Sequence, residues 1–305
     1  MDLSAEQADR AAGVLLGTAT GDALGAGYEF THPGPEVVID MIGGGPFDWA
    51  PGEWTDDTSM AVAVARAAAE AGNLHEVSGL DAVAAEFVRW WDSKPPDVGN
   101  QTSQVLRWRD RTGREMQVHA HELSGLKAGN GSLMRTAPVA LAYLGDAHLC
   151  AKAAAKVSSL THYDDQAIGA CKLWSLAIRH AVLHGTYDGV REALSVVDDG
   201  FWGPLLDRAE TGTPQDFPKN GWVVHALQTA WWAITNADTL PAALELAVRA
   251  GGDTDTTAAI AGGLLGARWG ASAIPERWVA VLHGYPGHRA DDLLALTRRL
   301  TANTL

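Results

Sequence analysis

The chain alternates between alanine-rich apolar runs and short breaks of glycine and proline. Within the runs, apolar residues recur at positions i, i+3 and i+4, which places them on one face of a helix. Ser4 is a suitable N-cap for the first run, which continues through Leu15 toward Leu24. The same spacing predicts further helices over residues 57–71, 80–92, 132–144, 147–158, 164–184, 221–235, 241–250, 256–269 and 291–300.

Little in the sequence favours β structure or a division into domains. Only residues 37–42 resemble a strand, and one strand of that length cannot found a sheet. The glycine and proline breaks are too short to be domain linkers, and no internal repeat is present. The pattern therefore predicts an all-α protein with one domain over residues 1–305.

Composition narrows the class of protein further. A chain of 305 residues that is 47% hydrophobic can bury a sizeable core, and 12 tryptophans are expected in that core or along a groove wall. A net charge of −14 without a run of Lys or Arg argues against a nucleic-acid partner. The N-terminus lacks a signal-peptide pattern, and no apolar stretch approaches the ~20 residues that span a bilayer. We therefore expect a cytoplasmic protein without a membrane anchor, in which Cys150 and Cys171 are reduced core residues.

Two acidic clusters carry the most specific chemistry. Residues 54–58 read Trp-Thr-Asp-Asp-Thr, and residues 251–257 read Gly-Gly-Asp-Thr-Asp-Thr-Thr. Either cluster alone could be a helix N-cap. However, Asp253 and Asp255 would point in different directions on a helix, and converge only if the turn before it is non-helical. Gly251 and Gly252 provide such a turn. Carboxylate and hydroxyl oxygens suit hard divalent cations, so the two clusters together predict a two-metal site.

Other candidate positions are weaker when each is taken alone. Residues 17–27 are small and would let a helix or a ligand approach closely, and Glu29 follows as an ordinary loop acid. Residues 125–132 form a glycine-rich turn that could hold an anion through backbone N–H groups at a helix start, or could simply be a capped turn. The turn is not a P-loop, because it lacks the Lys-Ser/Thr ending.

Two loop positions, His162 and Asp97, could either belong to a helix cap or contact a ligand. Residues 161–164, Thr-His-Tyr-Asp, fit a capping box for the long helix that follows, with His162 at its mouth. His162 would contact a ligand or face solvent. Asp97 follows Pro95-Pro96 and would either cap the next helix or project into a cleft.

Taken in order, these stretches resemble the ADP-ribosylglycohydrolase family, which includes dinitrogenase reductase-activating glycohydrolases and ADP-ribosylarginine hydrolases. The resemblance covers nearly the whole chain and rests mainly on the Thr-Asp-Asp-Thr and Asp-Thr-Asp-Thr pair. It implies a compact orthogonal helical bundle with two divalent cations, Mg²⁺ or Mn²⁺, at the bottom of a cleft. The implied metal ligands are Thr55, Asp56, Asp57, Asp253, Asp255 and Thr256.

The resemblance also implies a reaction and a substrate site. Glu29 or Asp56 would manage the proton of an attacking water, while Gly129, Asn130, Gly131, Ser132 and His162 would bind the ADP portion. Asp97 would face the guanidinium of an ADP-ribosylated arginine on a protein. Hydrolysis of a serine or small-molecule ADP-ribosyl linkage, and a non-catalytic crystallin-like protein that binds ADP-ribose, are the alternatives. A monomer is expected.

Overall fold

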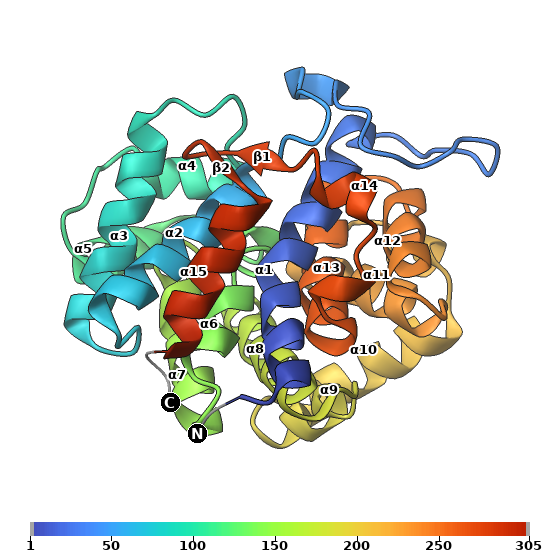
Figure 1. The fold of residues 1–305 in the computed structure, drawn as a ribbon. Helices are drawn as coiled ribbons and strands as arrows, with labels where there is room; N and C mark the ends of the chain where they lie inside the picture. Colours follow the sequence, from blue (N-terminus) through green and yellow to red (C-terminus); the bar gives the residue numbers. More distant parts are fainter. Residues whose placement is uncertain (1–2, 303–305) are drawn as a thin grey trace.

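The structure is a computed structural model that describes residues 3–302; residues 1–2 and 303–305, at the ends of the expected domain, lie outside this range. Within the described residues nearly all regular secondary structure is helical, as predicted (Figure 1). The longer helices are α1 (Ala5–Gly25), α2 (Asp56–Ala71), α3 (Val77–Asp92), α5 (Gly113–Glu122), α7 (Ala147–Ser159), α8 (Asp165–His184), α10 (Asp199–Thr211), α11 (Val223–Thr235), α12 (Leu240–Arg249), α13 (Thr254–Trp269) and α15 (Ala290–Ala302). Shorter ones are α4 (Asn100–Leu106), α6 (Ala137–Ala142), α9 (Gly189–Glu192) and α14 (Glu276–Val279), and strands β1 (His283–Gly284) and β2 (His288–Arg289) form a small antiparallel pair.

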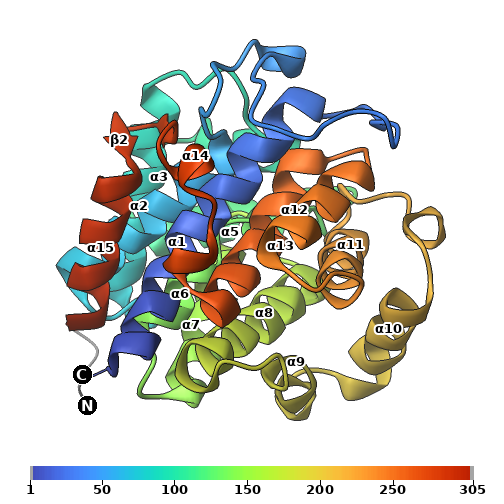
Figure 2. The same cartoon turned by 45° about the vertical axis from the view of Figure 1, so that its right-hand side comes forward.

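Helices α1 and α13 lie side by side at the centre of the molecule, and the other helices surround them (Figures 1 and 2). Gly13, Gly17 and Gly21 on α1 face Gly266, Gly262 and Ala258 on α13, with no room for a Cβ atom between the two backbones. The small residues at 17–27 thus allow a close helix contact, as expected. This contact fixes the C-terminal end of α1 against the N-terminal end of α13.

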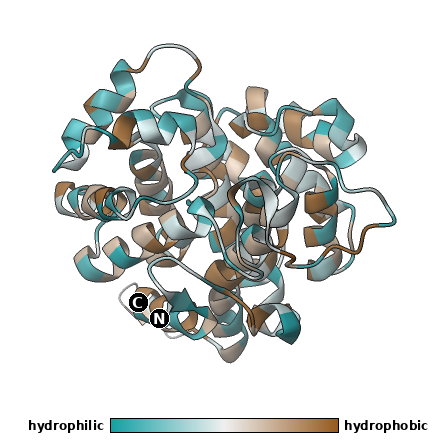
Figure 3. Cartoon of the chain, turned by 90° about the horizontal axis from the view of Figure 1, so that it is seen from above, coloured by the Kyte–Doolittle hydropathy of each residue, from teal (hydrophilic) through white to brown (hydrophobic). Residues whose placement is uncertain are grey.

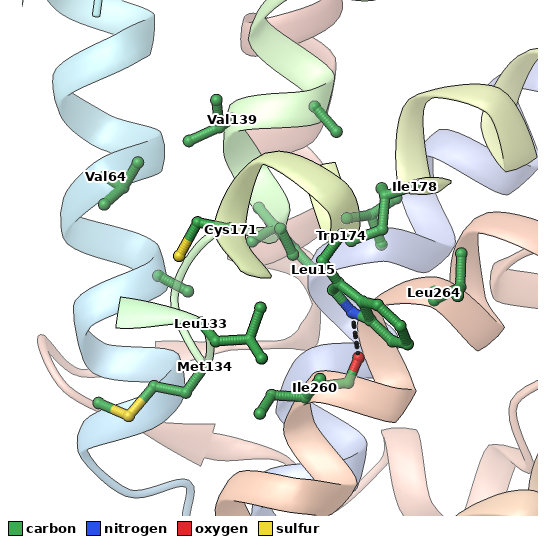
Figure 4. Close-up of a cluster of buried hydrophobic side chains, with 14 of the residues drawn as sticks. Leu15, Val64, Leu133, Met134, Val139, Cys171, Trp174, Ile178, Ile260 and Leu264 are labelled. Carbon is green, nitrogen blue, oxygen red and sulfur yellow. Dashed lines mark hydrogen bonds between the residues drawn. The ribbon is translucent and has the colours of Figure 1, made fainter. Parts of the chain in front are cut away.

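The apolar core extends from this helix pair to α2, α6 and α8 (Figure 4). Trp174 on α8 is buried, and its indole N–H donates to the carbonyl of Ile260 on α13, at 2.9 Å. Both cysteines are buried and unpaired, as predicted. The outer helices alternate between hydrophilic and hydrophobic positions along their length, as helices with one face toward a core do (Figure 3).

Two predicted elements are wrong, and several helices are missed. Residues 37–42 form no strand; the backbone of this irregular segment is held by the hydroxyl of Tyr28, which bonds to Val38 and Asp40. The helix expected over 132–144 is only α6, preceded by a 3₁₀ turn at Asn130–Ser132, because Pro138 is tolerated only in the first turn of a helix. Sequence periodicity missed α4, α5, α9, α10 and α14, which are short, polar or interrupted by proline.

No helix within residues 3–302 has both the length and the apolar character that crossing a bilayer requires.

Candidate active site

The structure brings the two acidic clusters together where the N-terminal ends of α2 and α13 meet. Thr55 caps α2 and donates its hydroxyl to Asp57 Oδ2 at 3.0 Å. From the other cluster, Thr256 Oγ1 lies 3.4 Å from the same oxygen. Asp56, Asp57 and Asp255 are all buried. Residues almost 200 positions apart therefore share one small polar centre inside the core.

The turn before α13 is non-helical, as the glycine pair predicted. Gly251 and Gly252 have φ values of 77° and 73°, which favour glycine. Asp253 occupies the N-cap position with a non-helical backbone, and its N–H donates to Asn220 Oδ1 at 3.1 Å. Asp253 therefore leaves the helical path, which lets its carboxylate approach the same centre as that of Asp255.

Glu29 reaches this centre through a backbone link between its loop and the glycine pair. The N–H of Phe30 donates to Gly252 O at 2.6 Å, and the N–H of Gly252 donates to Thr31 O at 3.0 Å. Glu29 is buried and lines the adjoining cleft. What reads as an ordinary loop acid in the sequence is thus fixed beside Asp253 and Asp255.

The carboxylates form two overlapping groups. In each group, one oxygen from every member lies within 4.8 Å of the others: Asp22, Asp57 and Asp255 form one group, and Glu29, Asp253 and Asp255 the other. Asp255 alone belongs to both. This geometry suits a ligand shared between two cations.

Asp22 is a site residue to which sequence reasoning assigned no role. Its carboxylate accepts the N–H groups of Thr55 and Thr58, both at 2.9 Å, and the hydroxyl of Thr58 at 2.6 Å. It therefore binds the first turn of α2, which carries Asp56 and Asp57. The sequence signal was an acidic residue within a run of small residues, in the stretch 21–25 that also forms part of the family resemblance.

Burial and mutual repulsion oppose ionisation of these acids. Burial, followed by the charges of Asp253, Asp97, Asp56 and Asp22, raises the pKa of Glu29 to about 8. Burial and neighbouring carboxylates also raise the pKa of Asp56, Asp57 and Asp255 well above the ordinary range. Such a group of carboxylates needs a compensating positive charge.

The donor set fits divalent cations. Among residues 3–302, no ion pair from Lys, Arg or His reaches these carboxylates. Glu29 Oε2 and Asp57 Oδ1 are buried without any hydrogen-bond partner. Orphaned carboxylate oxygens beside hydroxyl groups are the ligands that hard cations prefer. The chain thus has buried acidic clusters that can bind metal.

A cleft of about 1380 Å³ opens beside these clusters and includes the glycine-rich turn. Gly129, Gly131 and His162 line it, and the His162 ring packs against both glycines. The turn enters only a 3₁₀ turn, so the expected helix start is wrong here. The missing side chains at the two glycines leave room for the His162 ring at the wall of the cleft.

Two residues of the turn have other partners. The amide of Asn130 donates to Asp253 Oδ2 at 2.7 Å and to Asn220 O at 2.9 Å, so Asn130 joins the turn to the acidic centre. Ser132 is buried, and its hydroxyl accepts from Ser158 at 2.8 Å. The Ser132 side chain does not line the cleft, so the structure gives no support for its expected contact with a ligand.

Asp97 lines the cleft and does not cap α4. The N-cap of α4 is Gly99, which makes no side-chain capping bond. Burial and the charge of Asp253 raise the pKa of Asp97 to about 6. The capping interpretation of Asp97 is therefore wrong. Its side chain is close enough to Asp253 for the charge of that carboxylate to raise its pKa.

A second capping prediction, that of a capping box at residues 161–164, is also wrong. Asp164, not Thr161, caps α8, accepting from Gln166 N at 2.8 Å. His162 is buried rather than facing solvent. Sequence reasoning also missed Gln101 and Trp222, which line the cleft and have no distinguishing pattern in the sequence.

Comparison with known proteins gives one consistent result. The sequence pattern of the ADP-ribosylglycohydrolase family matches residues 3–304. The chain is 35% identical to ADP-ribosylarginine hydrolase Tri1 of Pseudomonas putida over 288 residues, covering 91% of this chain and 75% of the relative. It is 33% identical to ADP-ribosyl-[dinitrogen reductase] glycohydrolase of Rhodospirillum rubrum, covering 90% of each. A solved ADP-ribosylglycohydrolase-related protein complex superimposes with a TM-score of 0.80 at 30% identity, over 98% of this chain and 99% of that one.

Proposed function

This chain belongs to the ADP-ribosylglycohydrolase family, and we propose that it hydrolyses the N-glycosidic bond between ADP-ribose and an arginine side chain of a modified protein. It is an enzyme of the class that cleaves ADP-ribosyl bonds. The arginine linkage is supported by the names of the two bacterial relatives and by one observation in the structure. That observation is the carboxylate of Asp97, which lines the cleft beside the acidic centre without capping a helix.

The proposed cofactor is a pair of divalent cations, Mg²⁺ or Mn²⁺. Their ligands would be Thr55, Asp56, Asp57, Asp253, Asp255 and Thr256, as the family resemblance implies. Of these, Asp57, Asp253 and Asp255 belong to the carboxylate groups, and Asp255 would be shared because it belongs to both. When bound, two such ions supply positive charge and activate water near the ribose. Asp22 would contribute by holding the first turn of α2 in place.

We assign proton transfer and ligand binding to different residues of the cleft. Glu29 and Asp56 both line the cleft, and either can take the proton of the attacking water. The unpartnered Oε2 of Glu29 favours Glu29. Gly129, Gly131 and His162 would hold the ADP portion. Asn130, which also lines the cleft, would position Asp253 as well as contact the ligand.

The test of the arginine linkage is Asp97→Asn. Guanidinium keeps its charge at neutral pH, so a carboxylate binds it by a charge-assisted hydrogen bond that an amide does not replace. Losing one such bond is worth ~1.5–3 kcal/mol, so we expect turnover of ADP-ribosyl-arginine to fall roughly 10- to 100-fold. Affinity for ADP-ribose and the melting temperature should change little. Both are measured by calorimetry.

The matched control is Asp165→Asn, which removes an exposed carboxylate from the same cleft. It should keep wild-type turnover. Wild-type rates on ADP-ribosyl-arginine in the Asp97→Asn protein would refute the recognition of arginine by Asp97. In that case a panel of serine-linked and small-molecule ADP-ribosyl substrates, each with and without Mg²⁺, identifies the linkage. Binding of ADP-ribose without turnover of any linkage would instead indicate a non-catalytic protein.

Binding of the ADP portion is tested at Gly131. A Cβ atom at this position would lie 3.0 Å from Cε1 of His162 and 3.2 Å from its Nε2. We therefore expect Gly131→Val to weaken ADP-ribose binding at least about 10-fold by filling space beside His162. The circular dichroism spectrum should remain that of a folded helical protein. Unchanged affinity by isothermal titration calorimetry would rule out this part of the cleft as the ADP site.

A further inference from the structure

Arg135 is a fully buried cation that has no role in the proposed reaction. It follows the glycine-rich turn and is 0% exposed. Its guanidinium lies 4.5 Å from the ring centroid of Phe87 and donates to Thr161 Oγ1 at 2.7 Å. Nε is buried without a partner, and no carboxylate pairs with the side chain within residues 3–302. Burying a charge in this way is costly, so a compensating role is expected.

The contact with Thr161 determines where the hydroxyl proton of Thr161 goes. A guanidinium can only donate, so Thr161 Oγ1 must accept from Arg135. The same oxygen lies 2.8 Å from Nδ1 of His162. If Nδ1 carried a proton, Oγ1 would accept from both sides, and its own buried hydroxyl proton would have no acceptor. That arrangement is unfavourable, so the hydroxyl donates to an unprotonated Nδ1.

An unprotonated Nδ1 places the ring proton of neutral His162 on Nε2. His162 is 2% exposed, and burial together with the charge of Arg135 lowers its pKa well below the ordinary value, so the ring is neutral. The ring lines the cleft, and Nε2 lies 3.3 and 3.2 Å from the positions that Cβ atoms on Gly129 and Gly131 would occupy. No hydrogen bond within the described residues occupies Nε2. It is therefore a free donor directed at the cleft.

We propose that Arg135 is a positioning residue that, through the hydroxyl of Thr161, fixes His162 as the Nε2–H tautomer and so presents one oriented donor to an acceptor oxygen of the ADP-ribosyl ligand. The ligand part of this proposal rests on the proposed function. The tautomer part depends only on Arg135, Thr161 and His162. Arg135 does not touch the ligand; its effect passes through two side chains.

The first test is the ¹⁵N NMR spectrum of the histidine ring nitrogens in the ligand-free protein, with the His162 signals assigned by their loss in His162→Gln. We expect a protonated Nε2 and an unprotonated Nδ1 at neutral pH. Thr161→Val removes the hydroxyl and should give a mixture of tautomers, whereas Thr161→Ser should keep the wild-type pattern. Arg135→Met should also give a mixture, because the hydroxyl is then free to accept from Nδ1.

The second test is affinity for ADP-ribose by calorimetry. Thr161→Val should weaken binding about 5- to 20-fold, in the range of one lost or misdirected hydrogen bond, and Thr161→Ser should bind like the wild type. A protonated Nδ1 in the wild type, or an unchanged spectrum in Thr161→Val, would overturn the proposal. An unchanged spectrum in a folded Arg135→Met protein would overturn the role of Arg135; if that variant does not fold, the Val and Ser pair at Thr161 still tests the link from Thr161 to His162. Absence of ADP-ribose binding by the wild type would refute the proposed function and the ligand part, while the spectrum still decides the tautomer.

Discussion

Replacement of Asp255 by asparagine is expected to abolish turnover of ADP-ribosyl-arginine and to remove at least one bound metal ion per chain. Asp255 is the only residue common to both carboxylate groups, so its loss affects both proposed cation positions. A neutral amide is also a weaker ligand for a hard cation than a carboxylate. Elemental analysis after dialysis against Mn²⁺ measures the metal content. Two ions per chain in the variant would refute Asp255 as the shared ligand.

The same change should raise the melting temperature of the metal-free protein and reduce the stability that metal adds. Without metal, the variant should melt at a higher temperature than the wild type, because burial and the charges of Asp57, Asp253 and Glu29 make an ionised Asp255 unfavourable. With Mg²⁺ at a hundred times its Kd, the wild type should gain about 2.7 kcal/mol. For a chain of this size that corresponds to roughly 5 °C. The variant should gain much less.

Exposed Asp238→Asn is the control for this experiment, because it removes one carboxylate from the surface. It should leave both melting temperatures and the gain with Mg²⁺ unchanged. An Asp255→Asn protein that gains as much stability from Mg²⁺ as the wild type would contradict a metal site in this cluster.

Gly17→Ala is expected to destabilise the fold by about 3 kcal/mol, the upper end of the usual cost of overpacking. A Cβ atom at this position would overlap the backbone carbonyl of Gly262 on α13, and backbone atoms cannot yield as a flexible side chain can. The two helices would have to separate. Because α1 carries Asp22 near its end and α13 begins beside Asp255, separation would also disturb the acidic centre. Urea denaturation measures the loss of stability, and turnover measures the second effect.

Gly200→Ala is the matched control, since it makes the same chemical change at an exposed position in helix α10. A Cβ atom there would come no closer than 3.4 Å, to Asp198 Oδ1. Alanine favours helix over glycine by about 0.5–1 kcal/mol, so this variant should be as stable as the wild type or more stable. Equal stability of the Gly17 and Gly200 variants would contradict the close contact between α1 and α13.

Much of the fold could be predicted because its signals are local. Apolar residues at i, i+3 and i+4 identified most long helices to within a few residues. Ser4 caps α1 as expected, and the structure adds a capping box with Gln7. Short or polar helices such as α4 and α5 lack that periodicity, and Pro138 divides a run that looks continuous. The sequence also shows that the two acidic clusters contain carboxylate and hydroxyl oxygens, which can bind a divalent cation in any fold that brings the clusters together.

What the sequence alone determined, then, is the all-α class, the oxygen-rich clusters and the glycine turn before Asp253, because each depends on residues close together in the chain. Only the tertiary structure decided which side chains share a space. Only there is it seen that Asp22 binds the first turn of α2 and that Ser132 is buried against Ser158. Likewise, only there is it seen that Asn130 donates to Asp253 and that Thr161 lies between Arg135 and His162. These contacts depend on how helices far apart in the sequence pack, and hydrogen bonds of that kind leave no periodic pattern in the chain.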